Sequence, residues 1–166
     1  MKGTEIKGLL VEPADAGMGQ GSVDDLILDS EERRVLALQL IWTGAPRPFV
    51  APVEGIKSVD ARAVVLEPLT NIIPLQDSPA LIGKPTLNSL LEIEALNESG
   101  QVVGRLADVE VEVPEWTISS YDVRGDFAEA FYQGLHRVPV SEVRSGARSL
   151  TLTDRAIKEF GSDETA

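Results

Sequence analysis

The strongest constraint on the fold of this chain is a short pattern that occurs twice. Gly21–Asp29 reads Gly-Ser-Val-Asp-Asp-Leu-Ile-Leu-Asp, and Gly104–Glu112 reads Gly-Arg-Leu-Ala-Asp-Val-Glu-Val-Glu. Related residues recur at one offset of 83 residues: Gly21 with Gly104, Val23 with Leu106, Asp25 with Asp108, Leu26 with Val109 and Leu28 with Val111. Because both stretches are rich in β-forming residues, we expect one small β-unit that is used twice.

Length and composition limit what the two copies can be. The chain has 166 residues, which is enough for one ordinary domain or two small ones. Its 27 acidic and 15 basic residues give a net charge of −12, so it repels phosphate backbones and offers no basic surface for direct nucleic-acid binding. The absence of cysteine excludes a disulfide frame, a thiolate zinc site and a cysteine nucleophile.

Hydropathy indicates no membrane or export segment. No stretch reaches the roughly 20 apolar residues of a spanning helix, and the N-terminal residues show no signal-peptide pattern. We therefore expect a soluble, cytoplasmic protein.

The first copy, residues 1–68, reads as a series of short strands separated by turns. The expected strands are 5–11, 21–29, 35–42 and 63–66. Residues 69–83 are rich in proline, and we interpret them as a linker.

The second copy, residues 84–154, follows the same plan with an addition. The expected strands are 90–96, 102–106, 109–113, 116–123 and 150–152. Asp126–Leu135 has no counterpart in the first copy and predicts a short amphipathic helix or a long ordered loop. Thr153–Phe160 predicts a terminal helix capped by Thr153, so that residues 155–166 form a helix and a tail.

Segments behind the repeat complete a family signature. Ala51–Ser58 (Ala-Pro-Val-Glu-Gly-Ile-Lys-Ser) returns as Val138–Ser145 (Val-Pro-Val-Ser-Glu-Val-Arg-Ser) at an offset of 87 residues. Together with the Gly-x-Val-x-Asp-Leu-x-Leu-Asp strand and Ala63–Leu66 (Ala-Val-Val-Leu), this arrangement resembles the PRC-barrel family. Gly21–Leu66 carries the signature well, and Gly104–Leu152 carries it in a more divergent form.

The resemblance implies an all-β protein made of two tandem small PRC-type β-barrels, with a short helix in the second-copy insertion and a short C-terminal helix. The family includes the cytoplasmic domain of the photosynthetic reaction-centre H subunit and the C-terminal domain of the ribosome maturation factor. Its members are generally interaction modules rather than enzymes, and no shared catalytic residue or cofactor carries over to this chain. We expect the two barrels to pack as an intrachain pseudo-dimer, with a further homodimer left open.

Four glutamates form the sharpest candidate cluster. Glu92 and Glu94 alternate with apolar residues on one expected strand, as do Glu110 and Glu112 on another, so each pair lies on one face. If the two strands are neighbours, the like charges destabilise the sheet unless they are neutralised. A hard cation such as Ca²⁺, an arginine such as Arg105 or Arg144, or plain solvation would achieve this.

Other acidic residues read as structural. Asp25 and Asp108 occupy the same position in the two copies, and we expect Asp25 to accept backbone N–H groups at a bulge or turn. The acidic residues around Asp25 do not match an EF-hand loop and are interpreted as a solvated turn; they are Asp24, Asp29, Glu31 and Glu32.

The aromatic residues and the single histidine mark the expected contact surfaces. His136 lacks a recognisable nucleophile or acid partner, and we interpret it as a loop or barrel-rim residue. Trp42 and Trp116 fall on the two expected return strands, which favours core or inter-barrel contacts. The second-copy insertion is the predicted partner-binding surface, with Phe127, Phe131, Tyr132 and His136 as contact residues.

These observations predict a non-enzymatic module that acts through protein–protein contact. The sequence shows no catalytic triad, phosphate-binding loop or metal-ligand spacing, so we do not expect an enzyme. Two alternatives stay open: a ribosome- or RNA-maturation-associated factor that acts through a ribosomal protein, and a sensor that binds a small ligand or a metal. The first is compatible with the charge, because an acidic module can bind a basic ribosomal protein.

Overall fold

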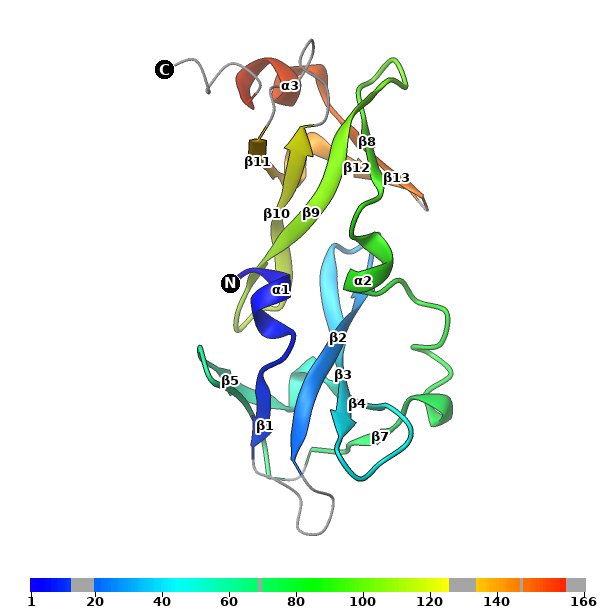
Figure 1. Ribbon diagram of the computed structural model, residues 1–166, viewed down its shortest axis with the longest axis vertical. Helices are drawn as coiled ribbons and strands as arrows, with labels where there is room; N and C mark the ends of the chain where they lie inside the picture. Colours follow the sequence, from blue (N-terminus) through cyan, green and yellow to red (C-terminus); the bar gives the residue numbers. More distant parts are fainter. Residues whose placement is uncertain (13–19, 69, 126–133, 147, 161–166) are drawn as a thin grey trace. The chain divides into compact units, whose positions relative to one another are not determined.

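The computed structural model of the chain describes residues 1–12, 20–68, 70–125, 134–146 and 148–160 (Figure 1). Strands dominate, and the helices in these ranges are short, which confirms the prediction of a mostly-β protein. The chain divides into two compact units. Unit 1 comprises Met1–Asn88 and Glu112–Thr117, and unit 2 comprises Ser89–Val111 and Ile118–Ala166.

Unit 1 begins with a short helix, α1 (Gly3–Ile6), and continues as strands. These are β1 (Leu10–Glu12), β2 (Gly21–Asp29), β3 (Arg34–Trp42), β4 (Phe49–Pro52), β5 (Ile56–Val59), β6 (Ala63–Leu66) and β7 (Ile73–Pro74). Hydrogen bonds join them in the order β5-β6-β1-β2-β3-β4-β7. The pair β1 and β6 is parallel, and the other pairs are antiparallel.

Unit 2 repeats this plan. Its strands are β8 (Glu94–Leu96), β9 (Val102–Glu112), β10 (Thr117–Gly125), β11 (Gly134–Pro139), β12 (Val143–Ser145) and β13 (Ser149–Leu152), followed by helix α3 (Asp154–Phe160). They are joined in the order β12-β13-β8-β9-β10-β11, with β8 and β13 parallel. The end of β9, the start of β10 and the turn between them belong to unit 1.

The repeat predicted from the sequence is confirmed as a repeated strand order, because β1 to β6 correspond one by one to β8 to β13. A 3-10 turn follows the fourth strand in both copies, as η1 (Val53–Gly55) and η3 (Val140–Glu142). The repeat also extends upstream. Helix α2 (Leu87–Leu90) precedes β8 as α1 precedes β1, and each helix is followed by a residue with positive φ, Gly8 at 88° and Glu92 at 70°.

The predicted closure into two barrels is not found. In the part of the chain that the structure describes, the strand path of unit 1 runs from β5 to β7 and that of unit 2 from β12 to β11, and no pairing joins the ends. The edge strands β5 and β12 have only 4 and 3 residues, so they offer few backbone groups for a closing ladder. Each unit is therefore an open, mixed sheet. The predicted pairing of the two copies stays a prediction.

Two expected strands are shorter than predicted because each begins inside a helix. The expected strand over 5–11 contains the end of α1, and only Leu10–Glu12 is extended. The expected strand over 90–96 likewise begins at the end of α2, and only Glu94–Leu96 pairs as a strand. The apolar residues Ile6 and Leu90 are buried by these helices, and a local apolar pattern does not distinguish such a turn from a strand.

The segment over 69–83, predicted as a linker, contributes structure to unit 1. Strand β7 pairs with β4, where Val50 lies opposite Ile73, and the 3-10 turn η2 (Leu75–Asp77) follows. Ile73, Leu75 and Leu81 pack on a buried cluster of Ile27, Ala37 and Val50. Unit 1 consequently reaches Asn88, whereas the sequence places the end of the first domain at residue 68 and the start of the second at 84.

The remaining predictions for unit 2 have mixed outcomes. The expected strands over 102–106 and 109–113 form one continuous strand, β9. The C-terminal helix is confirmed as α3, and the Thr153 hydroxyl accepts the backbone N–H of Ala156 at 3.1 Å, as a cap does. The helix or ordered loop predicted over Asp126–Leu135 falls mostly on residues 126–133, which lie outside the described residues, and its last two residues, Gly134 and Leu135, belong to strand β11. Among the helices that the structure describes, none has both the length and the apolar character needed to cross a membrane.

Candidate functional site

Two of the four candidate glutamates, Glu92 and Glu94, lie just before and at the start of β8 and close to arginines in the strand register. Glu92 Oε1 is 3.2 Å from Nη1 of Arg124, and the backbone carbonyl of Glu92 accepts a hydrogen bond from Arg105 at 3.2 Å. Glu94 lies directly opposite Arg105 across the β8–β9 pair. These glutamates therefore belong to a row of alternating charge.

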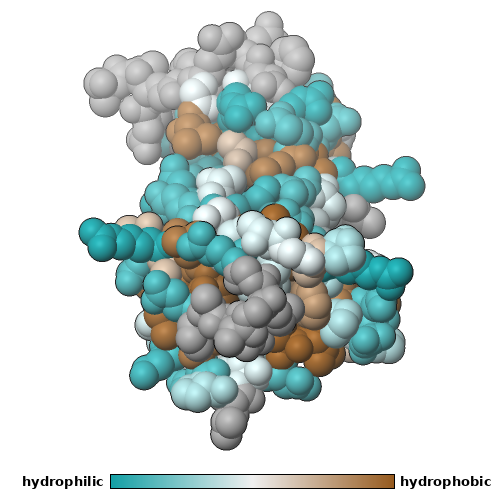
Figure 2. Space-filling model, turned by 60° about the horizontal axis from the view of Figure 1, so that its bottom comes forward, coloured by the Kyte–Doolittle hydropathy of each residue, from teal (hydrophilic) through white to brown (hydrophobic). Residues whose placement is uncertain are grey.

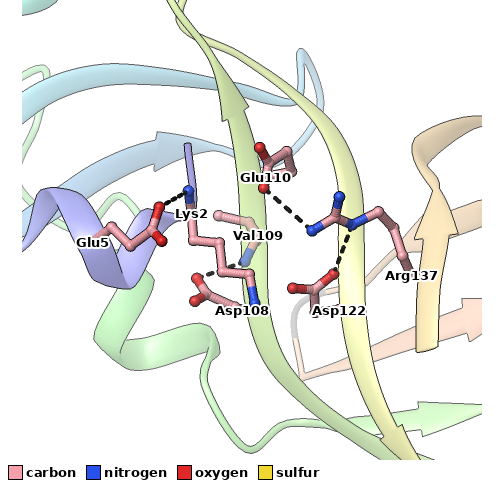
Figure 3. Close-up of polar contacts among 7 residues, drawn as sticks. All are labelled: Lys2, Glu5, Asp108, Val109, Glu110, Asp122 and Arg137. Atoms are coloured by element: carbon pink, nitrogen blue, oxygen red, sulfur yellow. Dashed lines mark hydrogen bonds and ion pairs between the residues drawn. The ribbon is translucent and has the colours of Figure 1, made fainter. Parts of the chain in front are cut away.

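The third glutamate belongs to a compact ionic cluster on β9, β10 and β11 (Figure 3). Arg137 donates from Nε to Oδ1 of Asp122 at 3.2 Å, and its Nη2 lies 3.5 Å from Oε2 of Glu110. The Asp122 side chain is 2 % exposed, whereas that of Arg137 is 56 % exposed. The half-exposed guanidinium of Arg137 thus compensates the negative charge of the buried Asp122 carboxylate. Glu112, at the end of β9, is exposed and belongs to unit 1.

The described residues contain no group of three or more histidines, cysteines or acids arranged to hold a metal ion. Of the alternatives left open by the sequence, neutralisation by arginine has direct support in the ion pairs of Glu92 and Glu110. The arginines are chiefly Arg124 and Arg137, which the sequence analysis did not single out.

The ionic cluster has an apolar counterpart in unit 1. At the repeat offset of 83 residues, Glu110 corresponds to Ile27 and Asp122 to Gln39. Arg137 lies opposite Asp122 as Val50 lies opposite Gln39. In unit 1 the face is mainly apolar, and its cluster of Ile27, Ala37 and Val50 is covered by the segment that contains Ile73, Leu75 and Leu81. Its polar member, Gln39, donates to Asp24 at 2.8 Å. The same face of the sheet therefore carries charged side chains in unit 2 and is covered by hydrophobic side chains in unit 1.

Asp25 has the structural role that the sequence predicts. A β-bulge displaces the β2–β3 register between Val23 and Asp25, and Asp25 is 5 % exposed. Its Oδ1 accepts the backbone N–H of Leu26 at 2.8 Å and that of Asn88 at 3.2 Å. Asp108 is also buried, and its Oδ1 accepts the N–H of Val109 at 2.9 Å. The shared aspartate therefore shapes the backbone at the same place in both copies.

Replacing Asp25 by alanine is expected to lower the free energy of unfolding by about 2 kcal/mol, because the buried N–H of Leu26 and the partly buried N–H of Asn88 lose their acceptor. Asp25→Asn keeps an acceptor oxygen of the same reach and is the matched control. Urea denaturation followed by circular dichroism measures both variants. An Asp25→Ala variant as stable as Asp25→Asn would show that the two hydrogen bonds contribute nothing.

Two exposed aspartates at turns have lowered pKa values. The pKa of Asp29 is lowered chiefly by the backbone N–H of Glu32, at 3.1 Å. The pKa of Asp60 is lowered chiefly by the backbone N–H of Arg62, at 2.7 Å. Because the folded-state pKa values lie below the ordinary one, these turns contribute fully above about pH 4 and lose their contribution as the pH falls. Asp29 thus fits the predicted polar turn.

The structure places the predicted contact residues in different environments or does not describe them. His136 lies on β11 opposite Val123 and is only 6 % exposed, so its side chain offers little surface to a partner. Phe127, Phe131 and Tyr132 lie outside the described residues. Trp42 is buried at the end of β3 and packs edge-to-face on Phe49, at 5.5 Å between ring centroids. Trp116 lies in the turn before β10 rather than on it, and is also buried.

Apolar side chains also reach the surface of unit 1. Leu10 and Ile41 are exposed by 40 % and 42 %, and both lie opposite Ser22, on the strands that flank β2. In unit 2 the corresponding row is Glu94, Arg105 and Arg124, so the copies differ here as well. Hydrophobic (brown) patches between hydrophilic (teal) side chains are visible in Figure 2.

A groove of about 230 Å³ lies along β5 in unit 1. Its lining consists of the residues of β5 (Ile56–Val59) together with Val113, Pro114 and Trp116. The Trp116 side of the groove is fixed in place, because the Trp116 carbonyl accepts the N–H of Val35 at 2.8 Å and its own N–H donates to the Glu112 carbonyl at 2.6 Å. Lys57 is the one charged residue of this lining, so the groove provides contacts for binding but no pair of groups for acid–base catalysis.

Comparison with family models and with proteins of curated function identifies no relative. No family model matches the sequence, and no protein of curated function is similar enough to suggest a relationship. The resemblance to the PRC-barrel family therefore stays a prediction from the motifs quoted above.

Proposed function

We propose that this chain is a non-enzymatic protein-interaction module, and that unit 1 binds a protein partner at the groove along β5. The observation that carries the proposal is the groove itself. It combines an apolar lining with a short edge strand that, among the described strands, pairs on one side only.

The character of the groove supports binding to a protein rather than to a small molecule. Its volume of about 230 Å³ lies below the range of about 300–1,000 Å³ that is usual for small-ligand sites. A volume of this size accommodates one or two side chains of a partner. The apolar lining provides hydrophobic contact, and the exposed residues Lys57 and Ser58 provide a polar rim.

Membership of the PRC-barrel family is part of the same proposal. It is supported by the sequence signature and by the strand order that the two units share. The family tendency toward protein contact agrees with the groove. A basic ribosomal protein is one partner that would fit a chain of net charge −12.

The experiment compares the proteins captured by the immobilised full-length chain and by three variants. Ser58→Glu and Pro114→Glu each introduce a charge into the groove at an exposed position. Ile41→Glu introduces the same charge at an exposed position of β3 and is the matched control. Mass spectrometry of captured lysate proteins is expected to find at least one protein that the wild type and Ile41→Glu enrich, and that both groove variants retain about tenfold less.

If every captured protein is retained equally by the groove variants and by the wild type, the groove is not a docking site and the proposal fails. Circular dichroism of the variants verifies that any loss of capture does not come from unfolding.

A further inference from the structure

We propose that the partner segment binds as an extended strand added to the free edge of β5, and that it alternates basic with apolar side chains. This inference rests on the proposed function and names the chemistry of the partner at the same groove.

The backbone of β5 presents hydrogen-bonding groups away from β6, the strand with which it pairs in the described part of the chain. Val59 lies opposite Val64, and the bond that follows this pair runs from Asp60 N–H to the Ala63 carbonyl at 3.1 Å. In an antiparallel ladder, residue pairs that exchange hydrogen bonds alternate with pairs that do not. Because the bond lies between the next two residues, Val59 and Val64 form a pair that exchanges none. The N–H and C=O of Val59 therefore point away from β6.

The other end of β5 follows the same rule. The bond from Glu67 N–H to the Gly55 carbonyl, at 2.8 Å, flanks the pair of Ile56 and Leu66. The carbonyl of Ile56 therefore also points away from β6, while its N–H donates to the Val53 carbonyl. An incoming strand thus finds acceptors at both ends of β5 and a donor at Val59, which is the pattern used in β-strand addition.

The groove beside this edge defines the side chains of the incoming strand. Alternate residues of a strand point to the same side, so a partner paired with β5 directs every second side chain toward Val113, Pro114 and Trp116. The apolar lining favours apolar residues at these positions. The intervening residues face the rim of the groove and the solvent.

The charges around the rim favour basic residues at the intervening positions. Glu112 and Glu115 are exposed next to the groove residues of the turn, and Glu54 and Asp60 are exposed just before and just after β5. Lys57 is the only base within β5. The net charge of −12 adds long-range attraction for a basic segment.

The same features argue against a second copy of this chain as the occupant. Two copies would bring two charges of −12 together.

The probe is a short fluorescein-labelled peptide that alternates lysine with valine, and fluorescence anisotropy at physiological salt measures its affinity for the full-length protein. Val59→Pro removes the outward N–H without touching the bonds to β6. Val59→Ala also shortens this groove residue but keeps the N–H, so the difference between the two variants isolates the N–H. We expect Val59→Pro to bind at least about tenfold more weakly than Val59→Ala.

A second measurement leaves the protein unchanged. A peptide of the same sequence with N-methylated backbone amides at alternate positions keeps its charge but loses the donors of a strand, and it is expected to bind about tenfold more weakly. A peptide with glutamate in place of lysine is expected not to bind.

Equal binding of the N-methylated and unmodified peptides, or equal binding by Val59→Pro and Val59→Ala, would mean diffuse charge attraction and would overturn the inference. Absence of binding by the lysine–valine peptide at about millimolar concentration would overturn it as well. The two failures are separable: if lysate capture still depends on the groove, strand addition is wrong and the proposed function stands, and if it does not, both are wrong.

Discussion

Replacing Gly104 by alanine is expected to destabilise unit 2 by about 3 kcal/mol, the upper end of the usual cost of overpacking. A Cβ atom at this position of β9 would lie 2.3 Å from the backbone oxygen of Arg124 and 3.0 Å from Cγ1 of Val123. A side chain can rotate away from such a clash, but a backbone carbonyl of the neighbouring strand cannot move without disturbing the sheet. Urea denaturation followed by far-ultraviolet circular dichroism, together with hydrogen exchange of the β9 and β10 amides, measures the loss.

Gly83→Ala separates this clash from the general cost of replacing a glycine. Gly83 has a φ of +84°, and a Cβ there would meet no atom within 4 Å. Its replacement is therefore expected to cost only about 1 kcal/mol of backbone strain. Equal losses for the two variants would contradict the close approach of β9 and β10. A Cβ at Gly21, the counterpart of Gly104, would lie 2.7 Å from the Trp42 ring instead, so the glycine makes room for different neighbours in the two copies.

Replacing Arg137 by valine is expected to destabilise unit 2 by about 2 kcal/mol. Breaking a fully buried ion pair costs about 3–5 kcal/mol, and the value is lower here because Arg137 is half exposed and partly screened by water. The loss arises because the Asp122 carboxylate, with 2 % of its side chain exposed, loses its 3.2 Å contact with the guanidinium. Chemical denaturation at neutral pH measures this free energy.

The double variant Asp122→Gln/Arg137→Val tests the cause. It installs in unit 2 the residues that unit 1 has at the same places, Gln39 and Val50. Because no buried carboxylate remains, the double variant is expected to recover most of the lost stability, with a coupling of about 1.5 kcal/mol in a double-mutant cycle. The exposed pair of Arg124 and Glu92 is the control, and its cycle is expected to give less than about 1 kcal/mol. Strictly additive losses for Asp122 and Arg137 would refute the coupling.

The sequence predicted those parts of the fold that local backbone chemistry dictates. Glycine is needed at Gly21 and Gly104 because a side chain there would meet the Trp42 ring or the backbone of Arg124. The aspartates Asp25 and Asp108 each accept the backbone N–H of the next residue. Because both copies need glycine and aspartate at these positions, the residues recur at a constant offset in the sequence. The start of each copy was misread because a helical turn with one buried apolar residue resembles a short strand.

The parts that could not be predicted depend on register and on contacts between distant segments. Arg137 meets Asp122 across β10 and β11, which are separated by an insertion, and a one-residue slip would turn the arginine to the other face. The alignment of the Pro52 and Pro139 segments was the one signal that could have placed it. The groove was missed because β5 and the Val113–Trp116 turn lie more than 50 residues apart in the sequence. The sequence predicted closed barrels instead of open sheets, because a family signature does not show how short the edge strands β5 and β12 are.

The contrast between the apolar face of unit 1 and the ionic face of unit 2 constrains the order in which substitutions can connect the two versions. Starting from glutamine and valine, an aspartate acquired first would be a buried anion without a cation, which is strongly unfavourable. An arginine acquired first can extend its head into water while its stem stays on the sheet, which costs little. A lineage that changes from the apolar to the ionic version one residue at a time must therefore gain the arginine before the aspartate. In the opposite direction it must lose the aspartate before the arginine. Reconstructed intermediates that carry aspartate with valine are expected to be the least stable members of such a series.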